Sequence, residues 1–333
     1  MPDSPLPRNI VLRFDMRSAP QCPDSPSDRY RAALEMAAWA DQRAVDVVGL
    51  SEHHDTEDGF LSAPLALAAM MCARTTRVRI SVSALLVPLH DPVRLAEDIA
   101  LIDQIAPGRF SATCGLGYRE QEYALFGVDW KQRGKVFDEK LDLLVAALAG
   151  GEFTHHGSTS QLVPAPATPV QALLLIGGNS KAAARRAARL GLGFCPAIDD
   201  PALAEAYSVE SKALGNPFSF VVFPREPSTT IINEDPERSW HMLGEYLLYD
   251  ATAYGKWHHP TRRAYAESFA TDLEALRAEG KYRIVTPAQA VDIVRQTNSL
   301  HLAPLVGGLP LDIGWESLRL FEEQVEPAIK SLG

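Results

Sequence analysis

The run Val47-Val48-Gly49-Leu50-Ser51-Glu52-His53-His54-Asp55 passes abruptly from apolar residues to titratable ones. Val, Leu and Gly suit a buried strand, whereas imidazoles and carboxylates gain nothing from packing inside a sheet. In a barrel of alternating strands and helices, the carboxyl ends of the strands carry the active site. The run therefore predicts a strand that delivers functional side chains to that end. The alternative is a polar loop that merely leaves the strand.

Strand and helix patterns alternate on both sides of this run. Strand patterns occur at residues 9–14, 46–50, 78–86, 109–114, 173–176, 193–197, 218–223 and 301–306. Helix patterns lie between them, at residues 28–43, 63–73, 133–148, 180–189, 201–214, 237–254 and 315–329, with two more that begin at Pro92 and Pro287. Eight strands interleaved with helices imply parallel pairing through right-handed crossovers.

A chain of 333 residues with this pattern closes most simply into an α/β fold of the (β/α)8 TIM barrel type. We expect one barrel domain over residues 1–333, with a loop insertion near 150–171 and a second insertion near 224–285 that is irregular around the helix at 237–254. The alternative is an open, doubly wound sheet. Against it, residues 15–20 after the first strand lack the glycine-rich turn that cradles a dinucleotide phosphate.

Composition narrows the class of protein. The chain is 46% hydrophobic and 22% charged, with a formal net charge of −10, so we expect no nucleic-acid partner. No apolar run approaches the roughly 20 residues of a membrane span, and the polar N-terminus lacks a signal core, so we expect a cytoplasmic protein away from membranes. The four cysteines are far apart and form no CxxC pair, which suggests neither disulfides nor a zinc site.

Five blocks of sequence resemble the bacterial luciferase-like family of flavin-dependent monooxygenases and coenzyme F420-dependent oxidoreductases. They span roughly residues 9 to 200 and run in the family's order. The first two are Glu52-His53-His54 and residues 86–98, LVPLHDPVRLAED. The third is LIDQ at residues 101–104 with Gly108-Arg109-Phe110, and the fourth is Gly115-Leu116-Gly117-Tyr118 with Glu122 and FGVD at residues 126–129. The fifth is IGGNS at residues 176–180 with AARLG at residues 187–191. The resemblance implies a barrel with insertions, in agreement with the element pattern.

The turn Gly177-Gly178-Asn179-Ser180 is a candidate phosphate site, because it joins a strand to a helix. Glycines let backbone amides turn toward a ligand, and a helix N-terminus offers N–H groups and partial positive charge to an anion. Arg185 or Arg186 could approach one turn later. A plain turn with a helix cap is the alternative; the resemblance implies that the flavin or deazaflavin phosphate binds here.

The resemblance also implies a binding surface for the flavin ring. Related proteins carry a non-proline cis peptide after the third strand, and matching positions places it at Ser83-Ala84. After the fourth strand, Gly115 permits a close approach, while Tyr118 and Arg119 can stack on a ring or pair with an anion. Some F420-dependent relatives have an acid where Tyr118 stands, so an acid's role is not carried over.

His53 is the catalytic candidate, since it matches the family histidine near the reactive face of the flavin and titrates close to neutral pH. We expect Glu52 to have a structural role, and His54 to have either a structural or a catalytic one. A metal site at His53, His54 and Asp55 is disfavoured, because adjacent side chains on an extended strand point to opposite faces. We therefore expect no metal ligands.

Aromatic residues on the late helix complete the candidates: Trp240, Tyr246, Tyr249, Tyr254 and Trp257. Their spacing predicts a core or a subunit interface first, and a substrate lid second. Residues 223–224 and 309–310, Phe-Pro and Leu-Pro, follow the last two strands and favour an apolar pocket.

These patterns predict an enzyme that uses reduced FMN from a separate flavin reductase to insert one atom of O2 into a small, apolar organic substrate. The sequence has no recognisable nicotinamide-binding motif, which agrees with a supply of reduced flavin from a separate reductase. An F420-dependent dehydrogenase or reductase is the alternative, and a non-catalytic flavin-binding protein is another. Relatives are commonly dimers or larger, so the resemblance implies a homo-oligomer.

Overall fold

The computed structural model describes residues 8–216, 219–225, 227–257 and 268–331, and it contains two kinds of sheet. The strands of the main sheet are β1 (Asn9–Phe14), β2 (Val47–Leu50), β3 (Arg79–Leu85), β4 (Phe110–Cys114), β7 (Leu174–Gly177), β8 (Gly193–Cys195), β9 (Thr229–Ile232), β10 (Tyr282–Val285) and β11 (Ser299–Leu302). Two further strands, β5 (Glu152–His155) and β6 (Ser158–Gln161), form an antiparallel hairpin.

Helices connect nearly all of the strands. They are α1 (Pro26–Asp41), α2 (Pro64–Arg74), α3 (Pro92–Ile105), α4 (Glu120–Leu125), α5 (Arg133–Leu148), α6 (Val170–Leu173), α7 (Lys181–Leu190), α8 (Pro201–Ala213), α9 (Pro236–Lys256), α10 (Leu273–Glu279), α11 (Pro287–Thr297), α12 (Leu311–Leu320) and α13 (Glu326–Lys330). Short 3-10 turns lie at Val87–Leu89, Trp130–Gln132 and Val306–Gly308, and a π-helical turn at Phe321–Val325 joins α12 to α13.

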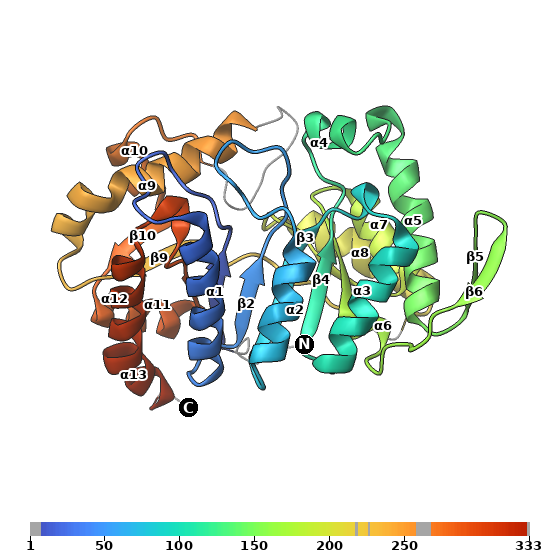
Figure 1. The fold of residues 1–333 in the computed structure, drawn as a ribbon, viewed down its shortest axis with the longest axis horizontal. Coiled ribbons are helices and arrows are strands. Elements are labelled where there is room, and N and C mark those ends of the chain that lie inside the picture. Colours follow the sequence, from blue (N-terminus) through green and yellow to red (C-terminus); the bar gives the residue numbers. More distant parts are fainter. Residues whose placement is uncertain (1–7, 217–218, 226, 258–267, 332–333) are drawn as a thin grey trace.

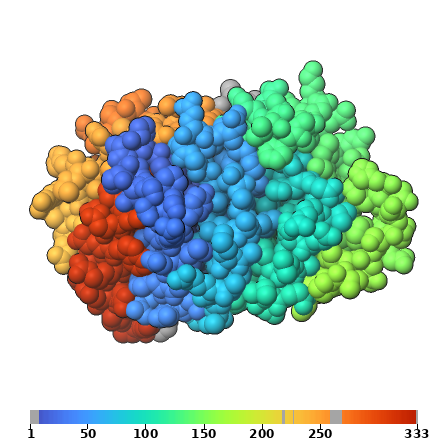
Figure 2. All heavy atoms as spheres, in the orientation of Figure 1, coloured from blue at the N-terminus to red at the C-terminus, as the bar shows by residue number. Residues whose placement is uncertain are grey.

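The main sheet is parallel throughout, in the order β10-β9-β11-β1-β2-β3-β4-β7-β8. Helices α1, α2 and α3 stand side by side in front of the strands (Figures 1 and 2), while α4, α9 and α10 lie at the end toward which β2 points (Figure 1). Parallel pairing brings the carboxyl ends of the strands to that end. The alternation and the pairing confirm the predicted α/β class.

Local sequence signals explain where the helices begin. Asp91 caps α3 by accepting from the amides of Val93 and Arg94 at 2.9 and 3.0 Å, and Pro92 follows as the first helical residue. Helix α5 has the predicted bounds and buries Phe137 and Leu141 on its apolar face. The starts of these helices were predictable because interactions between side chains and backbone within a single turn determine them.

Three predictions about irregular regions were wrong. The insertion near 150–171 is not a loop, because it contains the β5–β6 hairpin and α6. The strand predicted at 218–223 is a single parallel bridge between Phe194 and Val221, and Phe218 lies outside the described residues. The insertion near 224–285 contains the two strands β9 and β10 in addition to α9 and α10. These strands have four residues each, too few to show a period.

The core has two main parts. The larger fills the space between the sheet and helices α1 to α3, α5 to α8 and α11 to α13, with Ile10, Leu12 and Phe14 of β1 fully buried. The smaller lies under α9 and includes Trp240 and Leu309. Leu309, expected in a substrate pocket, is therefore a core residue. None of the described helices combines the length and the hydropathy needed to cross a membrane.

Candidate active site

His53 lies just beyond β2, buried at the carboxyl end of the sheet. Its Nδ1 is 2.8 Å from Oε1 of Glu122, and its Nε2 is 3.1 Å from the hydroxyl of Tyr118. Burial lowers the pKa of the imidazole, and although Glu122 opposes this shift, Arg119 and Arg17 add to it. His53 is therefore neutral at neutral pH, with its ring held at both nitrogens.

Glu122, on α4, organises the groups around His53. Its Oε1 accepts from the backbone amide of His54 at 2.9 Å and from Arg119 at 3.2 Å, in addition to its contact with His53. Burial opposes ionisation of this carboxyl, but the hydrogen bond from His53 and the other contacts outweigh it, so the pKa of Glu122 is lowered. An ionised Glu122 accepts a hydrogen bond from Nδ1–H, which leaves Nε2 as the acceptor nitrogen of the neutral ring.

Four aromatic rings surround His53. The ring centroids lie 4.8 Å away for Phe60, 5.3 Å for Tyr118, 6.4 Å for Tyr254 and 4.8 Å for Trp257. Tyr254 lies near the end of α9 and Trp257 follows its last residue; Tyr254 belongs to the main core and Trp257 packs against it, which agrees with the core role predicted first for the late-helix aromatics. These rings shield the imidazole from water.

Two arginines complete this enclosure. The guanidinium of Arg17 is fully buried and lies 4.6 Å from the ring centroids of both Tyr254 and Trp257. Its Nε is 3.1 Å from Asp58. Arg119 lies 4.4 Å from the ring of Trp257 and donates to the carbonyl oxygens of His54 and Asp55. Stacking against aromatic faces stabilises both cations in a space with little water.

A second network beside the first is built on Glu52. Its Oε1 lies 2.9 Å from Nε2 of His54 and 2.7 Å from Nε2 of His90, and its Oε2 accepts from the amide of Leu86 at 2.6 Å. Burial opposes ionisation, but these bonds lower the pKa of Glu52 to about 2. The structural role expected for Glu52 agrees with this arrangement. The imidazole rings of His53 and His54 contact different carboxylates.

The peptide bond between Ser83 and Ala84 is cis, at the predicted position. Gly115 lies against it: a Cβ added at Gly115 would stand 2.6 Å from Cβ of Ala84 and would clash. The amide of Gly115 donates to the carbonyl oxygen of Leu85 at 2.8 Å. Gly115 is thus needed for the packing of the two strand ends against each other.

The candidate phosphate turn follows β7. Gly178 has a φ of +134°, a conformation that L side chains rarely adopt, and Ser180 caps α7 by accepting from the amide of Ala183 at 3.2 Å. The side chain of Asn179 accepts from the amide of Ala197 at 2.7 Å. The remaining amides of the first turn have no acceptor within the helix, so they can face an anion.

Of the two arginines expected near this turn, Arg185 is exposed on α7, and its approach to a phosphate stays a prediction. Arg186 faces α5, where its guanidinium forms two hydrogen bonds with Asp138 at 2.6 and 3.1 Å, so the suggestion that it approaches the phosphate was wrong. Lys181 is exposed in the first turn of α7 and was not predicted. Its position is the better one for an anion at the helix end.

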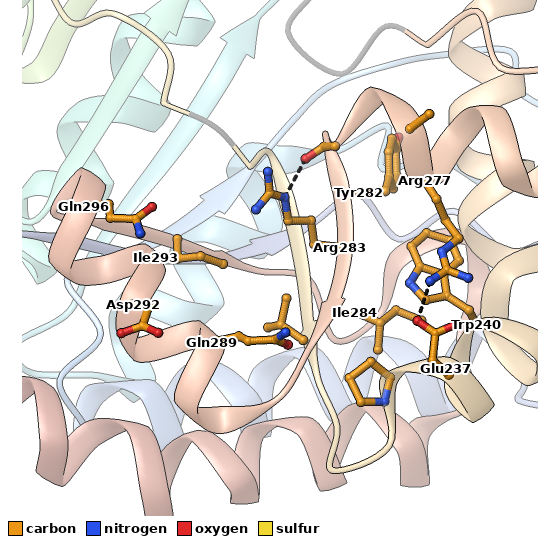
Figure 3. Close-up of a pocket in the computed structure, with 14 residues that line it drawn as sticks. Glu237, Trp240, Arg277, Tyr282, Arg283, Ile284, Gln289, Asp292, Ile293 and Gln296 are labelled. Carbon is orange, nitrogen blue, oxygen red and sulfur yellow. Dashed lines mark hydrogen bonds and ion pairs between the residues drawn. The ribbon is translucent and has the colours of Figure 1, made fainter.

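A pocket of about 520 Å³ lies elsewhere, between α9, α10, β10 and α11 (Figure 3). It is lined by charged and polar side chains such as Arg283, Gln289 and Asp292, together with Trp240 and Ile284. Trp240 is one of the late-helix aromatics singled out from the sequence, but none of the catalytic or cofactor-binding candidates lines this pocket. The candidate active site is therefore the group of residues around His53 at the strand ends.

A family model described as luciferase-like monooxygenase matches residues 12–299. The chain belongs to this family. Among curated relatives, the 4-hydroxyprotoasukamycin monooxygenase of Streptomyces nodosus subsp. asukaensis is 28% identical over 196 residues, which cover 54% of this chain and 53% of the relative. The chain spans about a third to a half of the length of the first curated relatives it matches.

Solved structures of other luciferase-like proteins have the same fold. Monooxygenase RslO1 from Streptomyces bottropensis has a TM-score of 0.71 and 21% identity, with 96% of this chain and 99% of that one covered. The oxygenating constituent of 3,6-diketocamphane monooxygenase from Pseudomonas putida, in complex with FMN, has a TM-score of 0.65 and 17% identity over 96% and 98% of the chains. An F420-dependent secondary alcohol dehydrogenase has a TM-score of 0.65 and 15% identity, with 97% of this chain and 99% of that one covered. This luciferase-like chain is therefore a TIM-barrel protein.

The sequence predicted some of the residues that meet at the candidate active site but not the others. His53, Tyr118 and Arg119 meet as expected at one end of the sheet. Glu122 was noted only as part of a family block, and Arg17 and Phe60 gave no signal. A buried arginine shortly after the first strand is the feature that could have drawn attention, because an unpaired charge there is costly.

Proposed function

We propose that this protein is a two-component monooxygenase that takes reduced FMN from a separate reductase and inserts one atom of O2 into a small organic substrate. The observation that carries the proposal is the buried His53, held between Glu122 and Tyr118 at the strand ends. Family membership and the FMN-bound neighbour support it.

The described residues fit a phosphorylated flavin. The amides of the Gly177-Gly178-Asn179-Ser180 turn, the N-terminus of α7 and Lys181 together form an anion-binding set. The cis peptide of Ser83 and Ala84, with Gly115, Tyr118 and Arg119, would border the ring. The orphaned Nη2 of the buried Arg17 leaves a donor for a polar ring or substrate atom, since no hydrogen-bond partner for it lies within the described residues.

Reduced FMN would supply the two electrons with which one oxygen atom enters the substrate and the other leaves as water. The protein's own part is proton handling and exclusion of water. Nε2 of the neutral His53 accepts a proton that the reaction releases, while Glu122 holds Nδ1–H and stabilises the imidazolium that forms. Arg17 and Arg119 keep that imidazolium short-lived, because they favour the neutral ring.

The aromatic enclosure suits an apolar substrate. The rings of Phe60, Tyr254 and Trp257 pack at steep angles against His53, and they exclude water from reactive groups. A homo-oligomer and a small, largely apolar substrate remain part of the proposal.

The test compares the two coenzymes directly. We expect photoreduced FMN with the protein and a panel of aldehydes, ketones and phenols to show O2 uptake and substrate oxygenation, and His53→Ala to bind FMN but turn over poorly. Flavin binding by the parent and by His53→Ala, with oxygenation by neither, would indicate a flavin carrier, and full turnover in His53→Ala would show that His53 does not handle the proton. Tight F420 binding without FMN-dependent O2 uptake would contradict the proposal.

An F420-dependent dehydrogenase is the second candidate, because one structural neighbour carries an F420-acetone adduct. In that case a hydride would pass from an alcohol substrate to F420 beside His53, and the imidazole would accept the proton of the alcohol hydroxyl. Its mark is substrate-dependent reduction of F420 with no consumption of O2.

A further inference from the structure

The β5–β6 hairpin places two adjacent histidines against a carboxylate of α3. His155 and His156 lie at its tip, and Nε2 of His155 is 3.3 Å from Oδ2 of Asp91. One possible ligand atom from each of the three side chains lies within 4.8 Å of the others. We propose that Asp91, His155 and His156 bind a divalent transition-metal ion of the zinc type, at a site that shares no residue with the candidate active site.

The turn of the hairpin explains how neighbouring histidines can share one ion. His156 and Gly157 form the two-residue loop between the paired His155 and Ser158, and both have positive φ, +48° and +78°. On a straight strand the two rings would point to opposite faces. The left-handed conformation of His156 instead brings its ring centroid to 3.9 Å from that of His155.

The choice of residue at this turn is informative. A two-residue hairpin loop of this kind favours Asn or Gly at the position of His156, because the positive φ is unfavourable for bulkier side chains. The chain uses histidine at this position, beside a second histidine and a carboxylate. Two imidazoles and one carboxylate are a donor set suited to zinc, cobalt, nickel or copper.

The distances fit such an ion. Zinc binds nitrogen and oxygen ligands at about 2.0–2.1 Å, so the ligands of a tetrahedral site lie about 3.3 Å apart. The Asp91–His155 separation has this value and is long for a charge-assisted hydrogen bond. Rotation of the exposed His156 ring can bring its nitrogen to the same spacing, and water completes the coordination.

Asp91 is positioned for this role by the helix it caps. Its Oδ1 accepts from the amides of Val93 and Arg94, which leaves Oδ2 directed at His155. The hairpin is anchored at its other end, since Phe153 is buried in the main core. A metal ion would therefore fix the hairpin tip to the loop from which the adjacent His90 contacts Glu52.

The experiment titrates the untagged, EDTA-stripped, full-length protein with ZnCl2 by calorimetry. Asp91→Asn keeps a side chain that can cap α3, and His156→Asn keeps a residue suited to positive φ, so both variants should fold. His241→Asn, at an exposed histidine of α9, is the matched control. We expect one Zn2+ per chain, with affinity at least about tenfold lower in Asp91→Asn and His156→Asn and unchanged in His241→Asn.

A second readout is independent of calorimetry. Zinc should raise the Tm of the parent and of His241→Asn but not of the two ligand variants, because a ligand stabilises only a protein that binds it. Absence of zinc uptake by the parent would overturn the proposal. Equal binding by the parent, Asp91→Asn and His156→Asn would also overturn it, because the zinc would then lie elsewhere.

Discussion

Oε1 of Glu122 lies 2.8 Å from Nδ1 of His53, although 69 positions separate the two residues and both side chains are buried. The contact joins the end of β2 to α4 and fixes which imidazole nitrogen faces Tyr118. A carboxylate in this place orients the ring and stabilises its protonated form without itself taking the proton. We expect the chemistry of the site to depend on it.

Glu122→Gln removes that charge and keeps the shape of the side chain. Because Glu122 raises the pKa of His53 against the larger effect of burial, its loss should lower that pKa further. The acid limb of the kcat profile then moves to lower pH, and kcat falls by about tenfold or more. Glu120→Gln, at an exposed position of the same helix, should change neither. An unmoved pH profile in Glu122→Gln would show that the contact is only structural.

Glu52→Gln should destabilise the protein in a pH-dependent way. The pKa of Glu52 is lowered in the folded state to about 2, so the ionised carboxylate contributes stability above its unfolded pKa of 4.5. That contribution, about 3 kcal/mol, is lost as the pH falls from 4.5 toward 2. Urea unfolding at pH 7 and at low pH should therefore show a difference from the parent that narrows with acidity. Glu57→Gln, an exposed neighbour, serves as control, and a difference independent of pH would contradict the account.

Gly115→Ala should disturb the strand ends. The added methyl would stand 2.6 Å from Cβ of Ala84, and overpacking of this kind costs about 1–3 kcal/mol. We expect a lower Tm and weaker FMN binding. Gly134→Ala is the matched control, since a Cβ there meets nothing within 4 Å and alanine favours the helix. Equal effects of the two substitutions would show that the tight packing at Gly115 has no energetic role.

Lys181→Gln tests the phosphate end. The side chain is exposed beside the N-terminus of α7, so its loss should weaken FMN binding roughly two- to fivefold, with less effect at high salt. Riboflavin, which lacks the phosphate, should bind both proteins alike. Lys212→Gln, in the last turn of α8, should leave both affinities unchanged. A parallel loss for riboflavin would place Lys181 away from the phosphate.

Local signals made much of the fold predictable. The cap at Asp91 and the proline that follows it involve α3 alone, the apolar face of α5 involves α5 alone, and the structure agrees with both. Strands β9 and β10 were missed, because runs of four residues are too short to show a period. The bridge at Val221 depends on pairing with Phe194, which no local pattern reveals.

The site was predictable to the extent that single strand ends carry its residues. His53 and Tyr118 follow β2 and β4, and parallel pairing brings such ends together. Arg17 and Trp257 lie far apart in sequence, and their stacking depends on how α9 packs over the sheet. Interactions of that kind become visible only with the tertiary structure.

The central claim is tested most directly by a crystal structure of the protein with FMN. The account predicts the phosphate on the amides from Gly178 to Ser180 and the isoalloxazine ring beside the Ser83-Ala84 peptide, within reach of His53. Density for FMN in the pocket between α9 and α11, or a phosphate remote from α7, would contradict it.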